Sequence, residues 1–231
     1  ATAHYSMGGI PMDKHGHVRK NNTEFDEGFY AAGECSCSSV HGANRLGANS
    51  VLEALLFGRF VGKTMVDEVD SIELHKATAA DAKRMVNEME WVLTNNGQES
   101  VSVLREELQQ SMTDNAGVFR SAETLSAQME ILKGLRARYK NIRIADKSKI
   151  FNTELQEAIE FGHMLDYSLF IVASALNRQE SRGAHFREDF PTRDDEKFLK
   201  HTMAYMDENG NINLDYMDVT LGRHEIKARS Y

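Results

Sequence analysis

The residues best suited to chemistry lie between positions 33 and 50, where small side chains surround a few charged ones. Glu34 follows a glycine, Arg45 lies among small residues, and Asn49 and Ser50 precede an apolar segment at 51–57 that is typical of a helix. A guanidinium matches the planar geometry of a carboxylate. Small residues before a helix let a ligand approach the backbone N–H groups, where the helix dipole favours negative charge. We therefore predict an anion-binding loop whose helix is capped by Asn49 or Ser50, a pattern that suits any anionic group.

The elements around this loop are predicted from the same stretch of sequence. Residues 29–32 are typical of a short buried strand that ends at Gly33 and Glu34. Cys35 and Cys37 form a C-x-C pair, but no second cysteine pair or nearby histidine completes a zinc-binding set. We expect the two cysteines to be buried thiols, and we expect no metal site.

The middle of the chain has the periodicity of helices. The sequence contains two prolines, at positions 11 and 191, so helix breakers are rare between them. Apolar residues at spacings of three and four predict helices over about 73–94, 98–113, 119–139 and 151–176. Asn152 or Thr153 is suited to cap the last of these. Helices joined by short loops predict an antiparallel bundle.

The last part of the chain combines a polar run with a hairpin signal. Asn209-Gly210 separates two strand-like runs, and residues 207–211 are interpreted as a turn because a calcium-binding loop needs glycine where Ile212 stands. Upstream lie four basic residues: Arg182, His185, Arg187 and Arg193. Two interpretations remain equally open for them, a clamp between domains or subunits near the active site and a polar loop paired with its own acidic residues.

Whole-chain composition excludes some classes of protein. The 231 residues contain 27 Lys+Arg and 35 Asp+Glu, a net charge of −8, which argues against a general nucleic-acid binder. No run approaches the roughly 20 consecutive apolar residues of a membrane span, so we expect no direct membrane insertion. By segment, the net charge is −1 over 1–60, −5 over 61–177 and −2 over 178–231. The near-neutral first segment leaves Arg45 free to set the local field.

The motifs resemble, in order along the chain, those of the flavoprotein subunit of succinate dehydrogenase and fumarate reductase. The resemblance rests on HYSMGG at 4–9, AGEC at 32–35, HGANRLGANS at 41–50, GVFR at 117–120 and ESRGAHFREDFPTRDD at 180–195. It implies an α+β, mostly α fold. The expected parts are the C-terminal end of a flavin-binding α/β domain (1–66), an antiparallel helical bundle (67–177) and a small α+β C-terminal domain with a hairpin (178–231).

The resemblance also implies an activity and a set of site residues. The family interconverts succinate and fumarate by hydride exchange with N5 of FAD. By resemblance, His4 and Arg45 bind the substrate, and Arg45 also contacts the cofactor. The further FAD-binding residues implied are Tyr5, Glu34, Ala48, Asn49, Ser50 and Val51. Most relatives have leucine where this chain has Val51. Two interpretations of His41 are equally open: it contacts the ligand, or it makes a structural hydrogen bond.

Several features of the family are absent from this sequence. No G-x-G-x-x-G motif follows a strand, and the first residue is Ala1. We therefore expect a C-terminal fragment that is inactive alone. The resemblance implies that the proton-donor arginine lies upstream. The resemblance implies an iron–sulfur subunit and a quinone-reactive membrane anchor as partners, and a peripheral location at the cytoplasmic face of the inner membrane.

Two alternative functions are weighed against this one. L-Aspartate oxidase shares the architecture, but its relatives usually have cysteine in place of Met7 and Met-Ala in place of Leu46-Gly47. Both positions favour the succinate group. A non-catalytic helical interaction module is the third possibility, and it predicts a protein without flavin colour.

Overall fold

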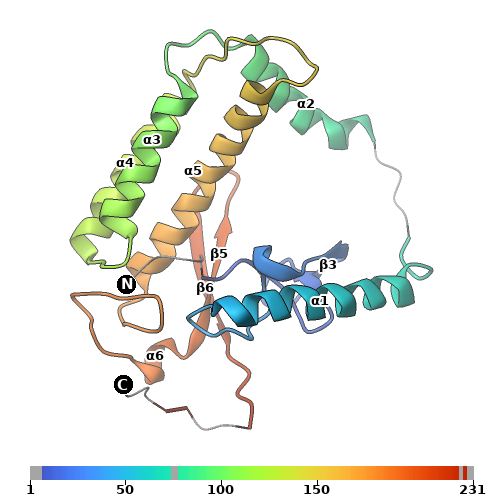
Figure 1. The fold of residues 1–231 in the computed structure, drawn as a ribbon, viewed down its shortest axis with the longest axis vertical. Helices are drawn as coiled ribbons and strands as arrows, with labels where there is room; N and C mark the ends of the chain where they lie inside the picture. Colours follow the sequence, from blue (N-terminus) through green and yellow to red (C-terminus); the bar gives the residue numbers. More distant parts are fainter. Residues whose placement is uncertain (1–6, 74–77, 224–225, 228–231) are drawn as a thin grey trace.

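The computed structural model describes residues 7–73, 78–223 and 226–227. Within them, long helices run side by side at one side of the molecule, and the longest helix of the first segment, α1, lies apart from them (Figure 1). Three small two-stranded sheets complete the described part. The mostly helical α+β fold expected from the sequence is confirmed.

The bundle consists of the helices that apolar periodicity predicts, with shorter N-terminal ends. They are α2 (Ala79–Thr94), α3 (Val101–Ala116), α4 (Ala122–Tyr139) and α5 (Thr153–Asn177). Helix α5 is central, because α2, α3 and α4 all pack against it. Fully buried side chains from all four helices fill the space between them, including Val92, Leu104, Leu132 and Phe161. The main core therefore lies here, well away from the loop with Arg45.

Helix α5 begins as predicted. The Asn152 side chain accepts a hydrogen bond from Leu155 N at 2.8 Å, which caps the helix. The 25 residues of α5 have a mean hydropathy of 1.2 over their most apolar stretch, so length and composition alone would suit a membrane span. One third of that stretch is buried inside the protein, where α5 contacts its neighbouring helices and the C-terminal hairpin.

The first segment has little core of its own. Strand β1 (Ile10–Pro11) pairs in parallel with β4 (Ser36–Cys37), and β2 (His17–Arg19) pairs antiparallel with β3 (Phe25–Tyr30). The prediction of a buried strand at 29–32 is wrong. The strand ends at Tyr30 and is largely exposed, because Asp26, Glu27 and Gly28 give it no continuous apolar face. A 3-10 turn (Gly33–Cys35) follows.

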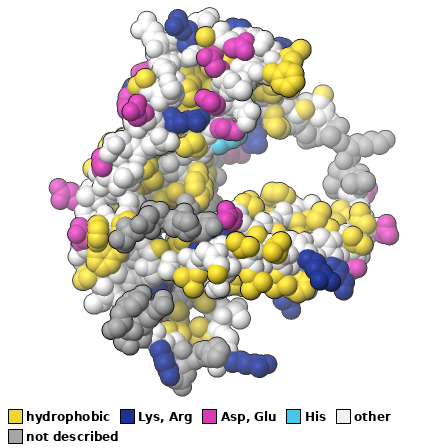
Figure 2. Space-filling view, in the orientation of Figure 1, with side chains coloured by type: hydrophobic (Ala, Val, Ile, Leu, Met, Phe, Trp, Pro, Cys, Tyr) yellow, Lys and Arg dark blue, Asp and Glu magenta, His cyan; other side chains and the backbone are white. Residues whose placement is uncertain are grey.

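Helix α1 (Gly47–Glu68) starts earlier than predicted. Its N-cap is Leu46, whose carbonyl accepts a hydrogen bond from Ser50 N at 2.9 Å, so Asn49 and Ser50 lie inside the helix. Gly47 and Ala48 have no large side chains to hinder this first turn. Many apolar side chains of α1 are exposed, and they gather along the helix in Figure 2. Exposed apolar surface of this extent is typical of an interface.

The C-terminal part forms a short helix and the predicted hairpin. Helix α6 (Asp195–Phe198) precedes β5 (Lys200–Met206), which pairs antiparallel with β6 (Ile212–Asp218). Asp207 accepts hydrogen bonds from Asn209 N and Asn211 N, which closes the turn between the strands. The interpretation of 207–211 as a turn is confirmed.

Candidate functional site

Arg45 is held by backbone carbonyls on one side and has a free nitrogen on the other. Its side chain is 4% exposed. Nη2 donates to the Ser36 carbonyl at 2.6 Å and to the Gly8 carbonyl at 2.9 Å. Nη1 is buried and has no hydrogen-bond partner among the described residues. A buried cationic donor without a partner favours an anionic ligand, because leaving such a group unpaired is costly.

A buried carboxylate lies beside this guanidinium. Glu53 Oε2 is 3.9 Å from Arg45 Nη1 and 2.8 Å from His41 Nε2, and the Ser38 hydroxyl donates to Oε1. His41 therefore makes the structural hydrogen bond that was one of its two interpretations. Its other ring nitrogen, Nδ1, is buried and has no partner in the described part of the chain. Sequence reasoning missed Glu53, since a single glutamate in an apolar helix carries no distinctive pattern.

The first turn of α1 presents free donors beside the same loop. Ala48, Asn49 and Val51 are exposed, and the N–H groups of residues 47–49 have no backbone acceptor in the described ranges. Ser50 is buried, and its hydroxyl has no hydrogen-bond partner there. Together with the dipole of a 22-residue helix, these groups suit a polar or negatively charged part of a ligand.

The other predicted residues lie in different surroundings. Glu34 is exposed in the 3-10 turn and has no partner among the described residues, so it is free to contact a ligand. Cys35 is exposed and Cys37 is half-buried, so the expectation of two buried thiols is wrong for Cys35. His4 and Tyr5 lie outside the described residues. In the described ranges, no three or more His, Cys, Asp or Glu side chains gather as metal ligands would.

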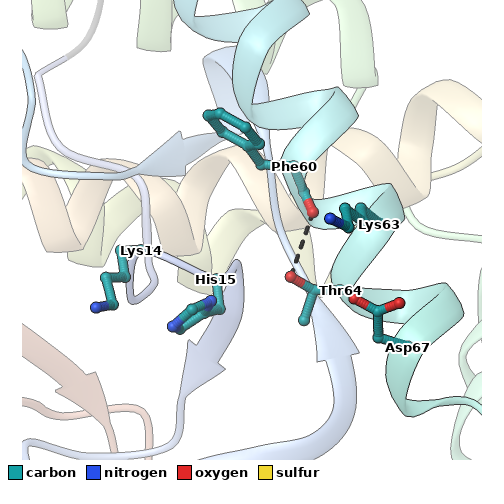
Figure 3. Close-up of a pocket in the computed structure, with 6 residues that line it drawn as sticks. All are labelled: Lys14, His15, Phe60, Lys63, Thr64 and Asp67. Atoms are coloured by element: carbon teal, nitrogen blue, oxygen red, sulfur yellow. Dashed lines mark hydrogen bonds between the residues drawn. The ribbon is translucent and has the colours of Figure 1, made fainter.

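Two cavities bear on the location of the site. Gly8, Ser36, His41 and Arg45 help to line a small cavity of about 20 Å³, enough for one water or one ligand atom. A larger, open pocket of about 370 Å³ lies between the 14–15 turn and the later turns of α1 (Figure 3). None of the predicted site residues lines this larger pocket, so its size does not make it the functional site.

The loop at 180–187 docks directly on the loop with His41 and Arg45. Ala184 N donates to the Ala43 carbonyl at 2.8 Å. Gly183 has φ of +60°, and a Cβ added there would lie 2.3 Å from that same carbonyl oxygen. Ser39 and His201 of β5 form a second contact, with 2.7 Å between Oγ and Nε2. The C-terminal part of the chain therefore helps to position the loop that carries His41 and Arg45.

The basic cluster of this docking loop is paired with local acidic residues. Arg182 contacts the buried Glu180 and also Asp195, which pairs with Arg193 as well. Arg187 is itself buried, forms two hydrogen bonds with Asp189 and donates to carbonyls at the end of α5. The paired-loop interpretation is confirmed for the three arginines but not for His185, whose ring bonds to Arg120 and to the Arg178 carbonyl. Ala184 of the same loop bonds to Ala43, whereas a role of the basic residues as a clamp near the active site stays a prediction.

His185 lies half-buried within this loop as a neutral residue. Arg120 Nη1 donates to Nδ1 at 3.1 Å, and Nε2 donates to the Arg178 carbonyl at 3.1 Å. Burial, together with the positive charges of Arg120, Arg178 and Arg187, lowers the pKa of His185 to about 4. Because its pKa in the unfolded chain is about 6.5, the unfolded state binds more protons between these two values.

We therefore expect acid to weaken the docking loop through His185. Its contribution to stability is present above pH 6.5 and is lost as the pH falls towards 4, by about 2 kcal/mol between pH 7 and 5. His185→Gln, which cannot titrate, is expected to flatten this dependence. Urea unfolding of both proteins at the two pH values measures it. An equal loss of stability in the variant would assign the effect to other groups.

The sequence of this chain is similar to those of known flavoproteins. Residues 105–231 match the family model for the C-terminal region of fumarate reductase flavoproteins, and residues 1–51 match that for an FAD binding domain. The succinate dehydrogenase flavoprotein subunit of Rickettsia bellii is 41% identical over 234 residues, covering 98% of this chain and 39% of the relative. The chain thus spans about two fifths of that relative's length.

Solved structures show the same architecture. A chain of E. coli quinol fumarate reductase superposes with a TM-score of 0.89 at 37% identity, over 97% of this chain and 38% of that chain. A chain of Mycobacterium smegmatis Sdh1 in complex with UQ1 gives a TM-score of 0.82 at 29% identity, over 94% and 36%. The fold described above is therefore that of these respiratory proteins.

Proposed function

Since the chain belongs to the family of succinate dehydrogenase and fumarate reductase flavoprotein subunits, we propose that it forms the substrate-binding C-terminal part of such an enzyme. Within a complete subunit, it would take part in the FAD-dependent interconversion of succinate and fumarate. The observation that carries this proposal is the buried Nη1 of Arg45, which has no hydrogen-bond partner among the described residues, next to a helix N-terminus whose first N–H groups have no backbone acceptor there.

We propose that Arg45 binds one carboxylate of a C4 dicarboxylate. Ser36 and Gly8 hold Nη2, which fixes the plane of the guanidinium and leaves Nη1 to donate to the anion. A donor fixed in advance stabilises developing charge without the cost of reorganisation. His4 is proposed to bind the other end of the substrate, as the family resemblance implies.

The described residues fit FAD at the start of α1. Ser50 offers a buried hydroxyl that has no hydrogen-bond partner in the described part of the chain, and Ala48, Asn49 and Val51 expose the first turn of the helix. We propose that these four residues, with Tyr5, Glu34 and Arg45, contact the cofactor, which when bound supplies hydride exchange at its N5 atom. The backbone N–H groups of the helix N-terminus would stabilise negative charge on the ring. Because backbone groups make the contact at Val51, the change from leucine is tolerable there.

The exposed apolar face of α1 favours a larger protein in which another part of the structure covers this helix. We propose that the remainder of an FAD-binding domain covers Leu52, Leu55 and Val66, whose exposure would be costly in water. We further propose the division 1–66, 67–177 and 178–231, although α1 itself continues to Glu68. An iron–sulfur subunit and a quinone-reactive membrane anchor are the proposed partners, with the complex peripheral at the cytoplasmic face of the inner membrane.

The test of this function uses the complete flavoprotein that contains the chain, purified with its partner subunits. We expect flavin absorbance and succinate-dependent reduction of an artificial dye acceptor. A colourless product without that activity would refute the proposal and favour the helical interaction module. Aspartate-dependent peroxide production without activity on succinate would instead identify an aspartate oxidase.

A further inference from the structure

One carboxylate connects α1 to the whole anion-binding loop. Glu53 lies in the second turn of α1, and its side chain is 2% exposed. It accepts hydrogen bonds from Ser38 and His41, and it lies 3.9 Å from Arg45. All three partners belong to the loop that leads into the same helix. The carboxylate therefore joins the start and the end of that loop.

Burial makes this carboxylate costly unless its charge is compensated. Arg45 provides the opposite charge, although Glu53 Oε2 is too distant from Nη1 for a hydrogen bond. The attraction therefore restrains the guanidinium without occupying the N–H groups of Nη1. Two carbonyls hold Nη2, and the Glu53 carboxylate faces Nη1. Nη1 is therefore kept in one orientation, while its N–H groups can still donate to a ligand.

We propose that Glu53 is a positioning residue for the dicarboxylate reaction, an inference that rests on the proposed function. It acts through Arg45 and His41 and does not touch the substrate. Its hydrogen bond from His41 Nε2 also fixes that ring, whose Nδ1 is left without a partner among the described residues. Glu53 therefore orders two nitrogen-bearing side chains that help to line one small cavity.

The charge of Glu53 gives the proposal a specific kinetic signature. A negative charge beside Arg45 opposes the binding of a dianion, so removing it does not weaken ground-state binding electrostatically. A guanidinium that is no longer held in place loses its alignment with the reacting substrate, and a displacement of about 1 Å can cost about 100-fold in rate. Loss of Glu53 is therefore expected to lower kcat while KM stays nearly constant.

The test compares three variants of the complete flavoprotein complex. Glu53→Gln keeps the size of the side chain, and its amide can accept from Ser38 and donate to a neutral His41. Glu53→Asp keeps the charge, and Asp67→Asn removes a charge from an exposed position on the same helix. With activity expressed per bound flavin, we expect Glu53→Gln to lower kcat about tenfold or more, with KM for succinate within about threefold.

The other measurements separate positioning from folding. The dissociation constant of malonate, a dicarboxylate that lacks the CH₂–CH₂ unit needed for oxidation, is expected to change less than about threefold in Glu53→Gln. We expect Glu53→Asp to recover most of kcat and Asp67→Asn to match the wild type. A normal kcat per flavin in Glu53→Gln, with only reduced stability or flavin content, would show a purely structural role and overturn the proposal.

A crystal structure of the Glu53→Gln complex provides a readout that does not depend on activity. We expect Nη1 of Arg45 to shift by about 1 Å from its present place beside residue 53, while Nη2 stays near the Ser36 and Gly8 carbonyls. An Arg45 in its original place overturns the positioning role. A wild-type complex without succinate-dependent flavin reduction refutes the proposed function instead, and this structural comparison then still decides the role of Glu53.

Discussion

Replacing Arg45 with lysine is expected to lower kcat/KM for succinate about 100-fold or more in the complete flavoprotein, a loss of ~3 kcal/mol of transition-state stabilisation. The guanidinium contacts two carbonyls through Nη2, while Nη1 has no hydrogen-bond partner in the ranges that the structure describes. A lysine ammonium is a single point of charge on a flexible stem. An ammonium that bonds to the Ser36 and Gly8 carbonyls has its charge drawn away from the substrate. An ammonium that binds the substrate instead leaves those two carbonyls without a donor.

The measurement is steady-state dye reduction, with flavin content determined for each preparation. Arg59→Lys is the matched control, because Arg59 is exposed on α1 and the substitution is chemically the same. We expect this control to match the wild type. A loss of less than about threefold in Arg45→Lys would remove Arg45 from the substrate site, since a shared anion clamp contributes far more than that.

Gly183→Ala is expected to damage both the docking loop and the activity. Its φ of +60° disfavours any residue with a Cβ, and that atom would lie 2.3 Å from the Ala43 carbonyl oxygen. Because backbone atoms face each other here, no side chain can rotate to relieve the contact. The 41–45 loop must move or the 180–187 loop must detach. We expect a stability loss of at least about 2 kcal/mol and a kcat/KM reduced about tenfold or more.

A second glycine separates the backbone strain from the collision. Gly28 has φ of +74°, but among the described residues a Cβ there would meet only Ile72, at an ordinary 3.7 Å. Gly28→Ala therefore reports the cost of the left-handed backbone alone, about 1 kcal/mol, and leaves the site unaffected. Urea unfolding and dye reduction of both variants measure the difference. If Gly183→Ala resembles Gly28→Ala in both assays, docking of the 180–187 loop does not control the site.

The Gly183 contact also explains how distant parts of the chain cooperate. The long α5 ends where Arg187 donates to its last carbonyls, and the same loop presents Ala184 to the carbonyl of Ala43. The bundle, which holds most of the buried apolar side chains, is therefore connected to the anion-binding loop through a few hydrogen-bonded residues. A rigid core of this kind can support a site whose own segment buries little apolar surface.

The helices of the bundle were predictable because their apolar residues recur with the period of the helix. Leu104, Leu132 and Phe161 are buried as that pattern requires, and Asn152 caps α5 through a local hydrogen bond. The hairpin was predictable from Asn209-Gly210, because the preference of these two residues for a tight turn is also a local property of the sequence. The start of α1 was predicted wrongly, because Asn49 and Ser50 are good capping residues but the helix begins at Gly47.

The sequence by itself determined the helical bundle, the hairpin and the family, and it predicted that the loop before α1 binds an anion. Its motifs identified Arg45 and Ser50, but not the groups that act on them. Only the tertiary structure showed that Glu53 lies beside Arg45 and that Gly183 faces Ala43. The reason is physical. Periodicity and capping arise between near neighbours in the chain, whereas the orientation of a guanidinium depends on charges and carbonyls that only folding brings within about 4 Å.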